Sequence, residues 1–436
     1  MTGPPMRAPA HVDTDRLTSL PYAVTTLARL LRPRRGGGFA VEATAGRVVA
    51  LAEHARAHVP YYRDLYGDMP LVAFSSVPLA DKASMVARPL EDRLSGPVPP
   101  GSRTIVTSGT TGVPMSAIYS PGLARWFGLL SARRLVVRRV RPWGRWLSLA
   151  FATDRRPGGG LLGWLRRRSR KLPLDMPTDE LVRTVLSFRP RVLTGHPHRL
   201  LDVGRPLLGG WKPALLLTHG ETLDAVLRAS LERAYGTAPI DSYGTTEVGP
   251  VAWQCRARDL YHIESESVLV EVLDQDDQPV APGDVGNVVV TGLTNHLMPF
   301  IRYRMADRAA LADRPCRCGH RGPALATIVG RSSDFAVDPR GGRISPELLW
   351  LYNNASSDVI MRVVRRYQVH QRLDGTIELR LELHTPLPVG FEESVLASYA
   401  RVSGGQPVEL RIMEDIGDAT PGKFRLVSSD LAGRLG

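Results

Sequence analysis

Long hydrophobic runs are missing from this sequence. No apolar segment approaches the roughly 20 residues that a membrane-spanning helix requires, and residues 1–15 contain prolines but no long apolar core. We therefore expect no membrane association and no signal peptide, and we expect a cytoplasmic protein. No internal repeat occurs either, which argues against a repeat architecture.

The sequence also lacks a Walker phosphate-binding loop, although residues 107–114 are rich in hydroxyls and glycine. The lysine that such a loop requires is missing, because Met115 and Ser116 follow the proline. Ile105 and Val106 indicate a strand that ends just before the segment, which would then present backbone N–H groups and hydroxyls to an anion. The residues concerned are Thr107, Ser108, Gly109, Thr110, Thr111 and Gly112. An ordinary surface loop is the alternative.

Acidic residues are outnumbered by basic ones. The chain has 56 Lys and Arg against 43 Asp and Glu, and a net charge of +13. The excess lies mainly in residues 32–35, 133–145 and 166–171. It favours an anionic partner, whether a nucleotide, coenzyme A, an acidic carrier protein or nucleic acid, and solvated basic faces are the alternative.

Apolar periodicity predicts a mixed α/β fold. Residues 214–217, 268–272 and 287–291 are typical of strands, and residues 178–188 and 223–234 follow helical patterns. We expect Thr178 and Asp179 to cap the first of these helices. At 436 residues the chain is long enough for two or three domains.

The last hundred residues have a different pattern of expected strands and helices. Two alternating segments, a helical pattern and a further strand pattern predict a small α+β module. They cover residues 362–370, 376–384, 392–402 and 408–413. A boundary near Gly330 follows, which gives one domain at 1–330 and another at 331–436.

Three further motifs have side chains suited to a nucleotide. In residues 242–247, Tyr243 would stack on a base, threonine hydroxyls would meet a phosphate, and Glu247 would hold Mg²⁺. Asp307 suits a ribose diol. Lys423, on a Pro-Gly turn, would bring an ammonium to developing negative charge. Surface ion pairs and a solvated turn are the alternatives.

These motifs, in this order, resemble the adenylate-forming superfamily, most closely its phenylacetate-CoA ligase branch. The resemblance covers most of the chain. The segments that carry it are Val59-Pro-Tyr-Tyr-Arg63, Leu79-Ala-Asp-Lys82, Met298-Pro-Phe-Ile-Arg-Tyr-Arg304, Gly330-Arg-Ser-Ser-Asp334 and Gly422-Lys-Phe-Arg425. It implies a large multi-sheet N-terminal domain and a small, mobile C-terminal α+β domain.

The resemblance also implies the role of each motif. Residues 107–112 would hold the β- and γ-phosphates of ATP. The adenine would lie along Gly220 and Glu221 and stack on Tyr243, with Gly244 and Thr245 beside it. Thr246 and Glu247 would serve phosphate and Mg²⁺, and Asp307 the ribose hydroxyls. Arg331, in the hinge motif, counts among the nucleotide-binding residues, and Lys423 would bind the carboxylate and the α-phosphate.

The reaction that the resemblance implies has two steps. A carboxylic acid attacks ATP to give an acyl adenylate and pyrophosphate, and rotation of the C-terminal domain then admits the thiol of coenzyme A. The usual hinge position corresponds to Ser333, with Asp334 one residue later. Because of this departure, an amine or the thiol of a carrier protein stays an alternative acceptor, in specialised metabolism. The acid and the oligomeric state, including a homodimer, stay open.

Cysteine is scarce, and its positions are informative. The three cysteines are Cys255, Cys316 and Cys318, and His262 lies seven residues after the first. Three thiolates and one imidazole would form a closed, structural zinc site. Three unrelated thiols are the alternative, and His320 is an alternative fourth ligand. Similar cysteine and histidine positions in the phenylacetate-CoA ligase branch support zinc.

Histidines and aromatic residues supply candidates for the acid pocket. In relatives, the segments that contain His196, His198 and His219 border the acyl pocket and the adenine. With Trp253, and with Trp126 and Phe127, they would frame a flat aromatic acid. Structural roles in the core are the alternative.

A basic, zinc-containing nucleic-acid-binding protein is the competing class. The cysteine and histidine spacing is not that of a C₂H₂ finger, and no RNP-like aromatic motif or helix-turn-helix pattern stands out. We therefore expect no nucleic-acid partner and favour an ATP-dependent carboxylic acid ligase.

Overall fold

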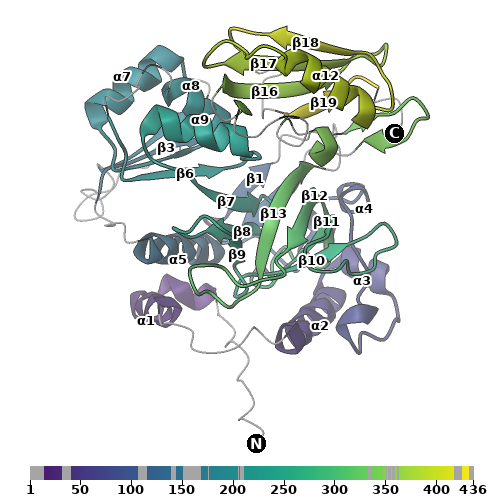
Figure 1. Ribbon diagram of the computed structural model, residues 1–436. Helices are drawn as coiled ribbons and strands as arrows, with labels where there is room; N and C mark the ends of the chain where they lie inside the picture. The colour runs from purple at the N-terminus through teal and green to yellow at the C-terminus, as the bar shows by residue number, and fades with distance from the viewer. Residues whose placement is uncertain are drawn as a thin grey trace, which may run out of the picture. The chain divides into compact units, whose positions relative to one another are not determined.

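The computed structural model describes most of the chain (Figure 1). The described residues are 14–31, 41–106, 115–138, 144–150, 168–174, 176–204, 206, 211–331, 335–344, 346–349, 351, 355, 359–360, 363–416 and 425–431. The chain divides into two compact units, Met1–Pro142 with Ser242–Ile328, and Trp143–Asp241 with Val329–Gly436. Both contain helices and sheets, which confirms the α/β class. No helix of the described part is long and apolar enough to cross a bilayer.

The first unit combines helices, a hairpin and antiparallel strands of the large sheet. Its described helices are α1 (Leu20–Leu31), α2 (Val41–His58), α3 (Pro60–Tyr66), α4 (Lys82–Val86) and α5 (Pro121–Val137), with short 3₁₀ turns η1 (Asp15–Thr18), η2 (Phe74–Ser76) and η3 (Glu91–Arg93). The hairpin is β1 (Arg103–Val106) with β2 (Ser116–Tyr119).

The strands of this unit follow the order β10-β11-β12-β13-β9-β8-β7. Their bounds are β7 (Ile240–Thr245), β8 (Gly249–Gln254), β9 (Tyr261–Ile263), β10 (Val268–Leu273), β11 (Val285–Gly292), β12 (Tyr303–Leu311) and β13 (Ala324–Arg331). The expected strands at 268–272 and 287–291 are confirmed as β10 and part of β11.

Helix α5 supplies much of the core of this unit. The Ser120 hydroxyl accepts a hydrogen bond from the Leu123 N–H at 3.2 Å and so caps the helix. Leu123, Trp126 and Leu130 follow at helical spacing and are buried. The Trp126 indole donates to the Ser267 hydroxyl at 2.8 Å, so this tryptophan is part of the core.

The second unit contains a parallel sheet covered by helices. Strands β3 (Trp146–Ala150), β4 (Ser169–Pro173), β5 (Val192–Gly195) and β6 (Leu215–His219) pair in the order β6-β5-β3-β4. Helices α7 (Thr178–Phe188), α8 (Pro197–Gly204) and α9 (Ala225–Tyr235) lie beside them (Figure 1). The helices predicted at 178–188 and 223–234, and the strand at 214–217, are confirmed.

The predicted cap of α7 is wrong. Its N-cap is Pro177, which makes no side-chain cap hydrogen bond, and Thr178 already belongs to the helix. The Thr178 hydroxyl instead accepts a hydrogen bond from the Arg199 guanidinium at 2.7 Å. A contact with α8 therefore replaces the local cap.

The C-terminal segment of the second unit forms its own sheet, in the order β18-β17-β16-β19. Its elements are β14 (Ala336–Val337), β15 (Arg343–Ile344), η5 (Pro346–Leu349), β16 (Val364–Gln371), β17 (Ile377–Leu383), α12 (Phe391–Val402), β18 (Val408–Ile412) and β19 (Val427–Ser429). The predicted α+β pattern is thus confirmed. Val226 of α9 shares this segment's apolar core, and the Ser230 hydroxyl donates to the Arg365 carbonyl at 2.6 Å.

Candidate active site

Strands β1 and β2 flank the hydroxyl-rich segment. Val106 pairs with Ser116 in the antiparallel hairpin, and the strand expected before the segment is present. Residues 107–112 themselves lie outside the described part of the chain, as does Lys423. Their nucleotide-binding and catalytic roles stay predictions.

Two residues predicted to bind the nucleoside lie in direct contact. The Tyr243 hydroxyl, on β7, donates a hydrogen bond to Asp307 Oδ2, on β12, at 2.6 Å. These positions are 64 residues apart in sequence. The phenol therefore orients the carboxylate, whose other oxygen can accept a ribose hydroxyl. Gly244 and Thr245 complete β7 beside them.

Glu247 interacts electrostatically with Asp307 and Lys82 in the first unit. Its side chain is buried, and burial raises its pKa, as does the charge of Asp307, whereas Lys82 lowers it. A carboxylate in this position favours a nearby cation, which fits the Mg²⁺ that the sequence predicts here. The Tyr119 hydroxyl donates a hydrogen bond to the Thr246 carbonyl at 2.7 Å and so fixes the backbone next to Glu247.

Lys82 and Tyr119 were not predicted to act at this site. Lys82 begins α4, and Tyr119 ends β2. The motif at residues 79–82 was the available signal for Lys82. Tyr119 gives no such signal, because its approach to Thr246 depends on folding across 127 residues.

In the second unit, Glu221 is held by two histidines. It follows β6, and its two carboxylate oxygens each lie 3.1 Å from an imidazole Nδ1, one of His196 and one of His198. Burial raises the pKa of Glu221, but these hydrogen bonds and the histidine charges outweigh it, so the pKa lies below its usual range. These residues were predicted to lie near the adenine and the acid, but their contact with one another was not predicted.

Gly220 is fixed beside the same cluster. Its φ is +84°, and a Cβ at this position would lie 2.8 Å from His196 Nε2. A side chain is therefore excluded by both conformation and space. The His219 ring packs edge-on against that of His196, with ring centroids 5.6 Å apart. The cluster at the carboxyl ends of β5 and β6 is thus closely packed.

Replacing Glu221 with glutamine is expected to lower the free energy of unfolding by about 2 kcal/mol near neutral pH, the scale of a charged hydrogen bond. The pKa of Glu221 is lower in the folded protein than in the unfolded chain, where it is about 4.3. The ionised carboxylate therefore stabilises the fold above the unfolded pKa, and this contribution is lost as the pH falls through the folded pKa. Urea denaturation of both proteins at several pH values tests this. Glu232→Gln, at an exposed position of α9, is the control. A difference that persists unchanged in acid contradicts the prediction.

The four predicted metal ligands meet in the first unit. The ligand atoms of Cys255, His262, Cys316 and Cys318 all lie within 4.8 Å of one another. The Sγ atoms of Cys255 and Cys316 are 3.7 Å apart, and Cys318 Sγ is 3.5 Å from His262 Nε2. Tetrahedral zinc with ordinary bond lengths requires separations of about 3.8 Å and 3.6 Å. These two separations match tetrahedral zinc, and the donor set fits this metal.

The surroundings of His262 suit a neutral ligand. Burial lowers its pKa to about 3, helped by the positive charges of His320, Arg133 and Arg138. His320 is not among the clustered ligands. Its ring stacks on His262, with centroids 4.1 Å apart.

Asp259, which was not among the predicted site residues, binds the loop that carries two of these cysteines. Its carboxylate accepts two hydrogen bonds from the Arg314 guanidinium, both at 2.8 Å, and one from the Arg317 N–H at 3.0 Å. Such support of the chain around the ligands is typical of metal sites.

The structure gives two of the aromatic acid-pocket candidates packing roles. Trp253 lies in the apolar cluster with Cys255 and Cys316, and its ring packs against His262 at a centroid distance of 5.0 Å. Trp126 is fully buried. The expectation that these tryptophans frame the acid finds no support in these contacts.

Arg331, predicted to bind the nucleotide, ends β13, and its side chain lies outside the described part.

Comparison with known proteins bears out the resemblance. No protein-family model matches the chain. The phenylacetate-coenzyme A ligase of Thermus thermophilus is 28% identical over 375 residues, 80% of this chain and 83% of that protein. The Escherichia coli protein of the same name is 28% identical over 320 residues, 68% of this chain and 72% of that protein.

A solved structure extends the comparison to the fold. 2-Hydroxyisobutyryl-CoA ligase in the postadenylation state, in complex with 2-HIB-AMP, has a TM-score of 0.72 and 20% identity. The match covers 93% of this chain and 95% of that chain. The expected fold, a large multi-sheet region with a smaller C-terminal α+β region, is therefore confirmed.

Proposed function

We propose that this chain, a relative of the phenylacetate-CoA ligases with the fold of an adenylate-forming ligase, activates a carboxylic acid with ATP and transfers the acyl group to coenzyme A. The observation that carries the proposal is the contact between Tyr243 and Asp307, with Glu247 nearby. Asp307 is 64 residues from Tyr243 in sequence, and the three side chains have the chemistry for a base, a ribose diol and a magnesium-bound phosphate. The similarity to curated ligases over most of the chain supports the same reaction.

The first step joins two anions. A carboxylate oxygen of the acid attacks the α-phosphorus of ATP, the bond to pyrophosphate breaks, and an acyl adenylate forms. Asp307 would hold the ribose, residues 107–112 the departing phosphates, and Lys423 the negative charge shared by the carboxylate and the α-phosphate. Glu247 would hold Mg²⁺, which neutralises phosphate charge when bound.

The second step transfers the acyl group to the thiol of coenzyme A and releases AMP. Residues 331–436 would be the mobile domain that withdraws Lys423 and admits the thiol. The acid is proposed to be aromatic, as the names of the curated relatives suggest. Zinc at Cys255, His262, Cys316 and Cys318 would be structural, because four protein ligands leave no open position.

Exchange of labelled pyrophosphate into ATP tests the first step directly. We expect exchange that depends on an added acid from a panel of aryl and alkyl carboxylic acids, with the reaction lacking acid as the control. Acyl-CoA and AMP should then form in equal amounts when coenzyme A is added. Adenylate formation without thioester would redirect the second step to a carrier protein or an amine. No exchange with any acid, together with tight nucleic-acid binding, contradicts the proposal.

A further inference from the structure

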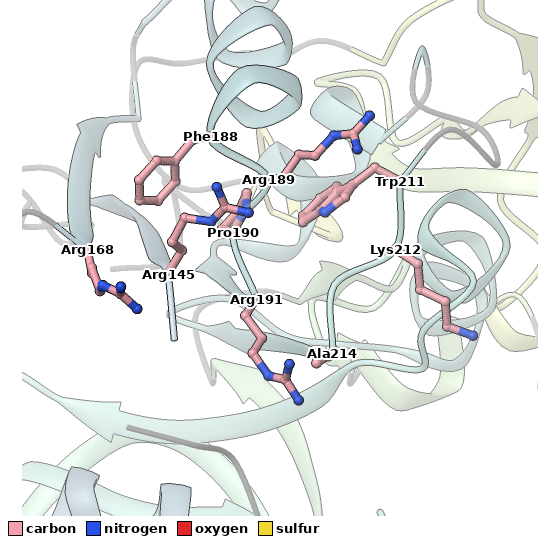
Figure 2. Close-up of a pocket in the computed structure, with 9 residues that line it drawn as sticks. All are labelled: Arg145, Arg168, Phe188, Arg189, Pro190, Arg191, Trp211, Lys212 and Ala214. Carbon is pink, nitrogen blue, oxygen red and sulfur yellow. The ribbon is translucent and has the colours of Figure 1, made fainter. Parts of the chain in front are cut away.

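A basic pocket lies at the amino ends of the parallel strands in the second unit. Its volume is about 630 Å³, and five of its nine lining residues are cationic. These are Arg145, Arg168, Arg189, Arg191 and Lys212 (Figure 2). Among the described residues, no aspartate or glutamate lines the pocket.

The register of the sheet brings three of the arginines together. Trp146 pairs with both Ser169 and Val192, so the arginines that precede these three residues occupy neighbouring positions on adjacent strands. The Trp146 N–H donates to the Arg168 carbonyl and the Arg191 N–H to the Arg145 carbonyl, both at 2.7 Å. Adjacent strands lie about 4.8 Å apart. Like charges on neighbouring strands repel one another, and a bound anion would offset this repulsion.

Three of these cations form no ion pair with any other described residue. They are Arg189, Arg191 and Lys212, and all three are exposed. The Arg145 guanidinium lies over the Phe188 ring, 5.9 Å from its centroid, and so has an aromatic rather than an acidic neighbour. The positive charge of Arg189, Arg191 and Lys212 is therefore available to a ligand.

This pocket is separate from the candidate residues at the other end of the same strands. Arg191 precedes β5 and His196 follows it, with four strand residues between them. That length spans about 13 Å. A small molecule held by Glu221 and Gly220 therefore does not also occupy the basic pocket.

We propose that the pocket binds a pyrophosphate group, either free or carried on a nucleotide, as a second site distinct from the one that serves adenylation. A guanidinium group can donate two parallel hydrogen bonds to the oxygens of a phosphate. Several guanidinium groups together can balance the negative charge of a pyrophosphate. The volume is that of a small-molecule site, which favours a compact ligand over a nucleic-acid strand. The half-buried Trp211 lines the same pocket and offers a surface for a nucleotide base (Figure 2).

Calorimetric titration of the full chain with inorganic pyrophosphate tests this site. The double variant Arg145→Gln, Arg191→Gln is expected to lose one equivalent of binding, or to weaken it by about a hundredfold, because two charged donors are removed. Arg183→Gln, at an exposed position of α7 outside the pocket lining, should bind as the wild type does. Tighter binding of ADP than of pyrophosphate at this site assigns the group to a nucleotide; the reverse assigns free pyrophosphate. Unchanged binding by the double variant overturns the proposal.

A second measurement uses the unaltered protein. Pyrophosphate should slow the acetylation of Lys212 by acetic anhydride, measured by mass spectrometry, and should leave the exposed Lys171 on β4 unaffected. Equal labelling of Lys212 with and without pyrophosphate also overturns the proposal. Neither measurement requires an acid or turnover, so a negative result here is distinct from failure of the proposed ligase activity.

Discussion

Replacing Lys423 with alanine is expected to lower the rate of acid-dependent pyrophosphate exchange by about a thousandfold. The acid and the α-phosphate of ATP are both anionic, and their approach concentrates negative charge as the new bond forms. An ammonium aimed at that charge stabilises the transition state more than the ground state, which is where effects of this size arise. ATP affinity should change little, because residues 107–112, Tyr243 and Asp307 would still bind the nucleotide.

The two half-reactions make this prediction specific. If Lys423 serves only adenylation, the variant should still convert a supplied acyl adenylate and coenzyme A into thioester at close to the wild-type rate. Such activity also demonstrates that the variant is folded. Lys171→Ala, on β4, is the matched control and should retain exchange. Full exchange by the Lys423 variant removes this lysine from the mechanism.

The sequence predicted elements well where periodicity and local breakers decide them. The bounds of α7 are those expected, because its apolar face repeats at helical spacing and Pro190 follows shortly after it. Its cap was predicted wrongly because Thr178 has a partner on α8, which no local pattern reveals. Local sequence rules thus located the helix, whereas a tertiary contact determined which partner the Thr178 side chain has at its amino end.

The candidate sites show the same division. The clustering of Cys255, His262, Cys316 and Cys318 could be predicted because the cysteines are so few that spacing and composition leave little choice. The contact between Tyr243 and Asp307, and the two histidines on Glu221, depend on strand pairing across long stretches of chain. The basic pocket illustrates this most clearly. Arg145 and Arg168 belong to separate charged stretches of the sequence, and only the register of β3, β4 and β5 makes them neighbours of Arg191.

Replacing Cys316 with serine is expected to remove the bound zinc and to destabilise the first unit by on the order of 4 kcal/mol, the scale of effect that loss of a structural metal produces. Cys316 is buried and lies between strand β12 and strand β13, whereas Cys255 follows β8. One ion would therefore tie three separate parts of the sheet together. Metal analysis after dialysis and thermal unfolding measure the two effects.

A chelator separates loss of zinc from loss of packing in this variant. The wild type should lose stability when zinc is removed, to about the level of Cys316→Ser, whereas the variant should not respond to chelator, because its site is already disrupted. Arg321→Ala, at an exposed position in the same loop, should keep both zinc and the response to chelator. Less than about half an equivalent of zinc in the wild type contradicts the site itself. If zinc is present but its removal leaves the unfolding temperature unchanged, the ion does not hold these strands, and the stability of the cluster comes from packing around Trp253 and Cys316.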